Sequence, residues 1–240
     1  MSQKPPATAT STRRTLVIAL VVVVTLLIGA LVAGEAYARH KFSRCISTQF
    51  EKDMGSKIDV GFGRRPMLLT LIDGKVSQVT VDSADSKFGP AVGMVVHARF
   101  KGLDVQNAEQ GGGTIDSSSA DVTWSNDGIR QTLGGLVSDV HSSSSSGMLT
   151  LDVLGGLAQL QVQPRVVNGV VQVDTMSAEL LGMGLPTDLV QGIVDVFTQS
   201  LQSYPMGLKA TDIKVTDDGI AVKLEGGRTE LEAATNGARC

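Results

Sequence analysis

Three histidines are the first candidates for metal binding or acid–base chemistry in this 240-residue chain. His40 follows an apolar run, His97 lies in an alternating segment and His141 begins a serine tract. The spacing among them is not typical of metal ligands, so we interpret all three as surface or strand residues. The sequence therefore predicts neither a metal site nor a cofactor.

The familiar catalytic motifs are also missing from the sequence. It contains no G-x-S-x-G nucleophile elbow, and the glycine run at residues 111–113 lacks the lysine and the strand–helix context of a phosphate loop. Asp212, Asp217 and Asp218 are interpreted as turn and surface acids, with cation binding as the less favoured alternative. We expect a protein that is not an enzyme.

The two cysteines, Cys45 and Cys240, are far apart in the sequence. In an oxidising compartment, a disulfide between them would connect the first helix of the domain to its C-terminal strands and constrain the unfolded chain. We predict this bridge; the alternative is two unpaired thiols.

Charge and composition exclude several classes of protein. The first fourteen residues contain three basic side chains and no acids, which leaves 18 basic against 24 acidic side chains in the rest of the chain. This acidic balance, without a basic stripe, excludes a nucleic acid partner. With 42% hydrophobic and 19% charged residues, the chain is too apolar for disorder and too polar for several membrane spans.

An uncharged apolar run from Leu16 to Ala33 is long enough, as a helix, to approach the roughly 30 Å thickness of the hydrocarbon layer. We predict a cytoplasmic tail at residues 1–14, a single transmembrane anchor at 15–34 and an extracytoplasmic domain at 35–240, in the periplasm or cell-wall space of the plasma membrane. The alternative is a signal sequence cleaved near Ala38, which would release a secreted domain.

Periodicity along the domain predicts an α+β fold, with a largely antiparallel sheet flanked by about three helices. Helices are expected at 42–54, in a short apolar turn from Met67, after Asn126 with Ile129 to Val140 on its face, and after Pro186. Residues 141–147 are expected to form a flexible serine loop. Asn168-Gly169 and Asp217-Asp218-Gly219 are predicted hairpin turns.

Two segments carry aliphatic residues on more than one face, at 67–72 and 181–197. One interpretation is an ordinary core. The other is a groove that accepts acyl chains, in which each buried methylene contributes about 0.8 kcal/mol. Periodicity alone leaves both interpretations open.

The order of several motifs resembles the actinobacterial LmeA-like phospholipid-binding family. These motifs are the N-terminal span, the helix ending near Gly55, the segment Arg65-Pro-Met-Leu-Leu69, and the ending from Met206-Gly207-Leu208 to Asp218-Gly219-Ile220. The resemblance covers about residues 36–225. It implies a cell-envelope protein that binds phospholipid and, in mycobacteria, supports elongation of mannose-containing lipoglycans. It also implies a curved sheet around a helix, similar to tubular lipid-binding folds.

On this basis a phospholipid is the expected partner. The residues expected to line its acyl chains are Met67, Leu68, Leu71, Met94, Val96, Phe100, Leu189, Ile193 and Phe197. Arg64 and Arg65 are candidates for the phosphate, with solvation as the alternative. The competing hypothesis is a structural envelope scaffold, whose apolar faces are all core and whose partner is another protein.

Overall fold

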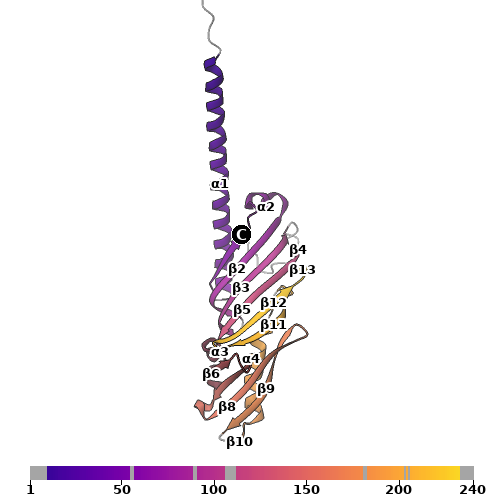
Figure 1. Ribbon diagram of the computed structural model, residues 1–240. Helices are drawn as coiled ribbons and strands as arrows, with labels where there is room; N and C mark the ends of the chain where they lie inside the picture. The colour runs from indigo at the N-terminus through magenta and orange to yellow at the C-terminus, as the bar shows by residue number, and fades with distance from the viewer. Residues whose placement is uncertain are drawn as a thin grey trace, which may run out of the picture.

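Figure 1 shows the computed structural model of the chain, in which a long N-terminal helix leads into two antiparallel sheets. The structure describes residues 10–54, 57–88, 91–105, 112–180, 183–202, 204 and 206–232. The predicted α+β class, with an N-terminal apolar helix and mostly antiparallel strands, is confirmed.

Helix α1 (Thr10–Met54) is 45 residues long and runs without a break through the predicted span and the predicted amphipathic helix. At about 1.5 Å per residue it extends roughly 68 Å. Its large apolar side chains from Ile18 to Val32 are exposed, whereas the later turns pack beside β1. Among the described residues, α1 is the helix long and apolar enough to cross a membrane, a property that a signal sequence shares.

Sheet A has eight strands. Six of them lie in the order β1 (Ile58–Phe62), β2 (Lys75–Phe88), β3 (Ala91–Asp104), β5 (Ser117–Ser125), β12 (Gly219–Gly226) and β11 (Lys209–Thr216). Strand β4 (Gly112–Ile115) pairs with β3 and with β13 (Thr229–Glu232). Each of these pairings is antiparallel, as expected for strands joined largely by short turns.

Sheet B has five strands in the order β10 (Met183–Gly184), β9 (Val170–Leu180), β8 (Ala158–Val167), β7 (Met148–Val153) and β6 (Val137–Ser143). Strand β11 of sheet A contacts β6, β8 and β9, so the two sheets share one core. The predicted hairpin turns at Asn168-Gly169 and Asp217-Asp218-Gly219 are confirmed by the pairings β8–β9 and β11–β12.

In the described part of the chain, three further α-helices accompany the sheets. α2 (Met67–Asp73) follows Pro66 and contacts α1 and β2, whereas α3 (Asn126–Leu133) and α4 (Thr187–Ser200) lie where sheet A meets sheet B (Figure 1). Ser125 begins α3 by accepting a hydrogen bond from Gly128 N–H at 3.1 Å. Trp124 at the end of β5 contacts Phe197 of α4, with ring centroids 5.5 Å apart.

Two sequence predictions in this region were wrong. The helix after Asn126 ends at Leu133 because Gly134 takes a left-handed φ of 56°, and Val137 and Val140 belong to strand β6. The serine tract is not a loop from His141: β6 continues to Ser143, and a tight turn leads into β7 at Met148. The apolar residues from Ile129 to Val140 have the spacings of three and four that fit a helix. The pair Gly134-Gly135 ends the helix, however, and pairing with β7 makes the following residues a strand.

One of these serines links the two sheets. Ser144 donates its backbone N–H to Asp217 Oδ1 at 2.9 Å, which joins the β6–β7 turn to the β11–β12 turn. The hydrogen bonds from Ser144, first from its hydroxyl and then from its amide, lower the pKa of Asp217 from its ordinary value of 3.8. The Asp217 carboxylate therefore favours the folded state when it is ionised.

The lowered pKa of Asp217 makes the stability of the folded protein depend on pH. Because the pKa of Asp217 is lower in the folded protein than in the unfolded chain, its stabilisation is present above about pH 4 and is lost as the pH falls through the folded value. We expect Asp217→Asn to be less stable than the wild type near neutral pH and to lose less stability on acidification. Urea unfolding at several pH values measures this, with the exposed Asp195→Asn as the control. Parallel pH profiles for Asp217→Asn and the wild type would contradict the prediction.

Candidate functional site

Sheet A has one apolar face that runs across six strands. The strand register places its side chains in rows, and one row joins Ile58, Ser83, Val96, Val122, Val222 and Ile213. We call this surface the apolar face; its members are Ile58, Val60, Phe62, Val79, Val81, Met94, Val96, Ala98, Phe100, Ala120, Val122, Trp124, Ala210, Ile213, Val215, Ile220, Val222 and Leu224. Alternation along each strand explains why so many apolar residues share one side.

The opposite face of sheet A is polar and charged. The residues that alternate with the apolar set on β2, β3 and β5 include Asp82, His97, Arg99, Lys101 and Asp121, all of them exposed. His97 Nδ1 lies 2.8 Å from Asp82 Oδ1 across the strands. This face is therefore solvated, and His97 is a surface strand residue, in agreement with its interpretation from sequence.

Burial varies along the apolar face. Met94, Trp124 and Ile220 near α3 and α4 are buried, and so are Ala98, Phe100, Ala120, Val222 and Leu224 further along. Among them, Val81, Val96 and Val122 are half-buried and pack against the core. Two serine hydroxyls on the same face, those of Ser83 and Ser118, are buried and have no hydrogen-bond partner among the described residues. The face thus combines incompletely covered valines with two unpaired hydroxyls.

The structure brings some of the predicted acyl-lining residues together. Met94, Val96 and Phe100 share the apolar face on β3, and Met94 pairs with Trp124, which contacts Phe197 of α4. Ile193 and Phe197 are fully buried, and Leu189 is half-buried against them. Ile193 and Phe197 are therefore core side chains in this structure, whereas Val96 and Leu189 are partly accessible.

The remaining predicted residues lie at the other end of sheet A, on α2. Met67 is buried and Leu68 is half-buried, while the side chain of Leu71 lies outside the described part of the structure. Two neighbours within the predicted segment are exposed: Leu69 at 45% and Ile72 at 83%. The helix thus presents aliphatic side chains to its surroundings instead of burying all of them.

A polar junction fixes α2 to α1. Glu35, two residues after the apolar run, accepts hydrogen bonds from the backbone N–H groups of Met67 at 2.7 Å and Leu68 at 3.1 Å. Arg39 forms an ion pair with Glu35 at 2.6 Å and donates to the carbonyl oxygens of Phe62 at 3.2 Å and Arg65 at 2.8 Å. We call these contacts the α1–α2 junction. Sequence reasoning missed them, although an acid directly after an apolar run was a visible signal.

The two predicted phosphate contacts differ in their surroundings. Arg65 forms an ion pair with Asp73 and donates to the Lys75 carbonyl at 3.1 Å. The hydrogen bond from Lys75, followed by that from Arg65, lowers the pKa of Asp73. Arg65 therefore closes the α2 turn, whereas Arg64 is exposed beside it.

Removing the Glu35 carboxylate tests the α1–α2 junction. A helix of seven residues is too short to be stable alone, so α2 depends on its contacts. We expect Glu35→Ala to cost about 1 kcal/mol, since Glu35 is partly exposed, and to raise amide hydrogen exchange in α2 several-fold. Hydrogen-exchange mass spectrometry of the full chain measures this, with the exposed Glu179→Ala as the control. Unchanged exchange in α2 would show that the carboxylate does not hold the helix.

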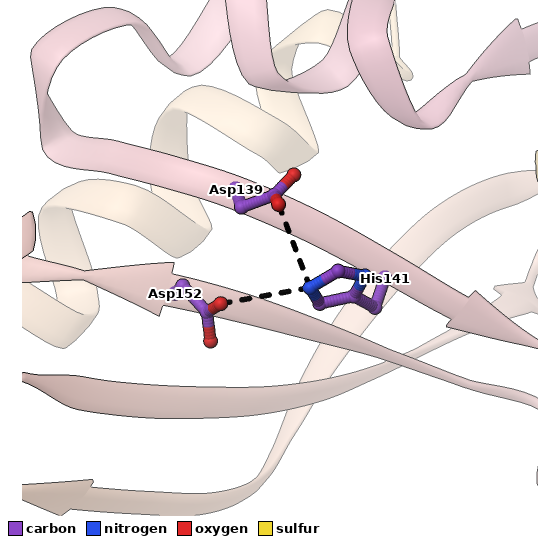
Figure 2. Close-up of side chains that lie close together, drawn as sticks. All are labelled: Asp139, His141 and Asp152. Carbon is purple, nitrogen blue, oxygen red and sulfur yellow. Dashed lines mark ion pairs between the residues drawn. The ribbon is translucent and has the colours of Figure 1, made fainter. Parts of the chain in front are cut away.

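Asp139, His141 and Asp152 form a cluster that the sequence did not predict (Figure 2). His141 Nε2 lies 3.6 Å from one carboxylate oxygen of each aspartate. The other oxygens are engaged: Asp139 Oδ1 accepts from Val140 N–H at 2.8 Å, and Asp152 Oδ1 accepts from Gln159 Nε2 at 3.1 Å. A β-bulge before Asp139 creates this grouping. Because Asp139 and His141 are exposed, we interpret it as a surface charge cluster.

Two open hollows lie away from the accessible part of the apolar face. One of about 510 Å³ is lined by strand residues that include Val95, Trp124 and Ile220 and by the β11–β12 turn, and one of about 450 Å³ lies between Ser144 and Lys214. Neither has the enclosed apolar lining of a typical small-molecule pocket.

The predicted disulfide between Cys45 and Cys240 stays a prediction. Cys45 is half-buried on α1, and Cys240 lies outside the described residues.

Comparison with known proteins points to lipid. A family model described as LmeA-like phospholipid-binding matches residues 29–225. The uncharacterized protein Mb0489c of Mycobacterium bovis and the uncharacterized protein Rv0479c of Mycobacterium tuberculosis are each 25% identical to this chain over 232 residues, covering 91% of this chain and 67% of their own length. No solved structure matches the chain, so the expected likeness to tubular lipid-binding folds stays a prediction.

Proposed function

The chain belongs to the LmeA-like phospholipid-binding family, and from this premise we propose that it is a membrane-anchored protein of the cell envelope that holds phospholipid acyl chains against the apolar face of sheet A. The observation that carries the proposal is a group of half-buried valines, Val81, Val96 and Val122, from two adjacent rows of a face whose reverse is charged. Hydrocarbon covering these valines would remove apolar surface from water, at about 25 cal/mol per Å².

Polar groups in and beside the apolar face suit a phospholipid rather than a plain hydrocarbon. The hydroxyls of Ser83 and Ser118 are buried donors without a partner among the described residues, and the ester carbonyls of a phospholipid are acceptors. Arg64 beside α2 is an exposed cation available to a phosphate. Arg65 is less suitable because Asp73 already pairs with it.

The α1–α2 junction supports an anchor that is retained. Cleavage near Ala38 would remove Glu35, which holds the first turn of α2. With the apolar run of α1 in a bilayer, Glu35 stands just outside the hydrocarbon, and α2 lies at the same level with Leu69 and Ile72 exposed. In this arrangement α2 rests at the membrane surface, beside the apolar face that receives the lipid. The proposed orientation is N-terminus in the cytoplasm and domain in the periplasm or cell-wall space.

We also propose that the protein has no catalytic activity and supports envelope lipid or lipoglycan maintenance by binding lipid. The alternative is a scaffold whose partner is another envelope protein. The buried packing of Ile193 and Phe197 favours that alternative for the α4 region, because these side chains already have core partners. The half-buried valines of the apolar face favour lipid.

The experiment uses the full chain in lipid nanodiscs with a phospholipid whose acyl chain carries a photoactivatable group. After illumination, peptide mass spectrometry locates the adducts. We expect adducts on β2, β3 and β5 at the apolar face and none at Arg99 or Asp121 of the polar face. Adducts confined to α1 would leave the scaffold as the better hypothesis.

A further inference from the structure

The turns at the two ends of sheet B have opposite character. At one end are the serine turn between β6 and β7 and the Asn168-Gly169 turn between β8 and β9. At the other end, the chain enters β6 through the 3₁₀ turn Gly134–Leu136 and passes from β7 to β8 through the 3₁₀ turn Leu154–Gly156. No polar side chain occurs in residues 133–137 or 153–158. These two turns therefore offer no polar group except their backbone.

Three leucines are exposed there: Leu136 at 40%, Leu154 at 48% and Leu157 at 61%. They lie close together because Val137 pairs with Val153, and Val153 pairs with Ala158. We call Leu136, Leu154 and Leu157 the apolar tip. Single exposed leucines are ordinary, but three on adjoining turns that carry no polar side chain form a patch that needs an explanation.

The backbone at the apolar tip adds a second observation. Leu154 has a φ of 53°, in the left-handed region that glycine and asparagine adopt more readily. A leucine at this position gains only partial burial in return, since about half of its surface is exposed. The stability of the turn alone therefore does not explain a leucine at this position.

The apolar tip is at the same end of sheet B as β10. Strand β9 ends at Leu180, which pairs with Ala158, so β10 belongs to the same end of sheet B. In Figure 1, β10 is at the extremity of the domain opposite the start of α1. A chain anchored by α1 would thus hold the apolar tip far from its own membrane.

We propose that the apolar tip inserts into the interfacial layer of a second lipid surface, so that the protein connects two lipid surfaces; this inference rests on the proposed anchoring by α1. Protein partners usually add a directed hydrogen bond for every 100–200 Å² or so of interface, and these turns offer no polar side chain for one. A lipid surface requires none, and water among the headgroups hydrates the glycine backbone.

Acidic residues next to the apolar tip indicate which lipid headgroups it accepts. After the pair Val137–Val153, the next cross-strand pair of β6 and β7 is Asp139–Asp152, whose carboxylates are exposed or partly exposed. His141 lies between them, and Arg130 is paired with Asp127. An acidic rim is repelled by anionic headgroups, so the surface it fits has zwitterionic or uncharged headgroups. Insertion is shallow because these carboxylates must stay in water.

The test uses the full chain reconstituted in vesicles, with labelled phosphatidylcholine vesicles as the second surface. Capture of the labelled vesicles is measured by co-flotation. We expect capture by the wild type, a loss of about tenfold or more in the triple variant Leu136→Gln, Leu154→Asn, Leu157→Gln, and weaker capture when half of the second lipid is phosphatidylglycerol. Leu154→Asn suits the left-handed backbone, which protects the turn from strain. The control Met176→Gln removes an exposed apolar side chain within β9 and should change capture less than about twofold.

Equal capture by the wild type and a triple variant with an unchanged unfolding midpoint would overturn the proposal. Failure of the reconstituted wild type to capture bare lipid vesicles would also overturn it and point to a protein occupant. The nanodisc adducts on the apolar face are measured independently. Adducts on the apolar face without vesicle capture would overturn only the proposed role of the apolar tip. Vesicle capture without such adducts would support that role and overturn the proposed lipid binding on sheet A.

Discussion

Replacing Phe197 with alanine is expected to lower the free energy of unfolding by about 3–5 kcal/mol. Phe197 is fully buried on α4, and its ring lies 5.5 Å from that of Trp124, which is 1% exposed. Trp124 is fixed in turn, because its Nε1–H donates to the Val92 carbonyl at 2.8 Å. The pair therefore joins α4 to sheet A, and truncation leaves a cavity that a fixed indole cannot fill.

Urea unfolding of the full chain in detergent measures this loss through the fluorescence of the single tryptophan, Trp124. The control is Leu189→Ala on the same helix, which removes a half-buried side chain and is expected to cost about 1–2 kcal/mol. The comparison also separates two roles for α4. If Phe197→Ala reduced phospholipid adducts while stability stayed unchanged, Phe197 would line a lipid site, and its assignment to the core would be wrong.

Much of the fold could be predicted because local signals agreed with the tertiary structure. Pro66 and Pro186 stand immediately before α2 and α4, where a residue without an N–H is tolerated. Asn168-Gly169 forms its hairpin turn because Asn168 and Gly169 both have the positive φ values that the turn requires. These elements are specified by a few neighbouring residues, so sequence alone was sufficient.

The failures have a common physical cause, which is that pairing between distant strands overrides local spacing. Val137 and Val140 fit a helical face, yet pairing with β7 places them in β6. The same pairing, with its bulge, places Asp139 and Asp152 around His141, a cluster with no signature in sequence spacing. The predicted acyl-lining set mixed core and accessible residues for the same reason. Periodicity identifies which face of a helix or strand is apolar, whereas the burial of that face depends on which other elements pack against it.

Val96 and Val95 provide the sharpest test of lipid binding. They are neighbours on β3, both half-buried, and alternation along the strand directs Val96 to the apolar face and Val95 to the polar one. We expect Val96→Asp to reduce phospholipid adducts on the apolar face by about tenfold or more, because an ionised carboxylate cannot be covered by acyl chains without losing its hydration. Val95→Asp should leave the adducts within about twofold, since that face already carries charges.

A milder variant separates lost binding from lost folding. Val96→Thr keeps the shape of the side chain and adds one hydroxyl, so its fold is retained more readily than that of Val96→Asp. Adducts are counted per folded molecule, with unfolding midpoints measured for each variant. Graded losses in the order Val95→Asp, Val96→Thr and Val96→Asp would follow from hydrocarbon lying on this face. If Val95→Asp and Val96→Asp bound phospholipid equally well, the apolar face would be core alone, and the lipid would have to be held elsewhere on the chain.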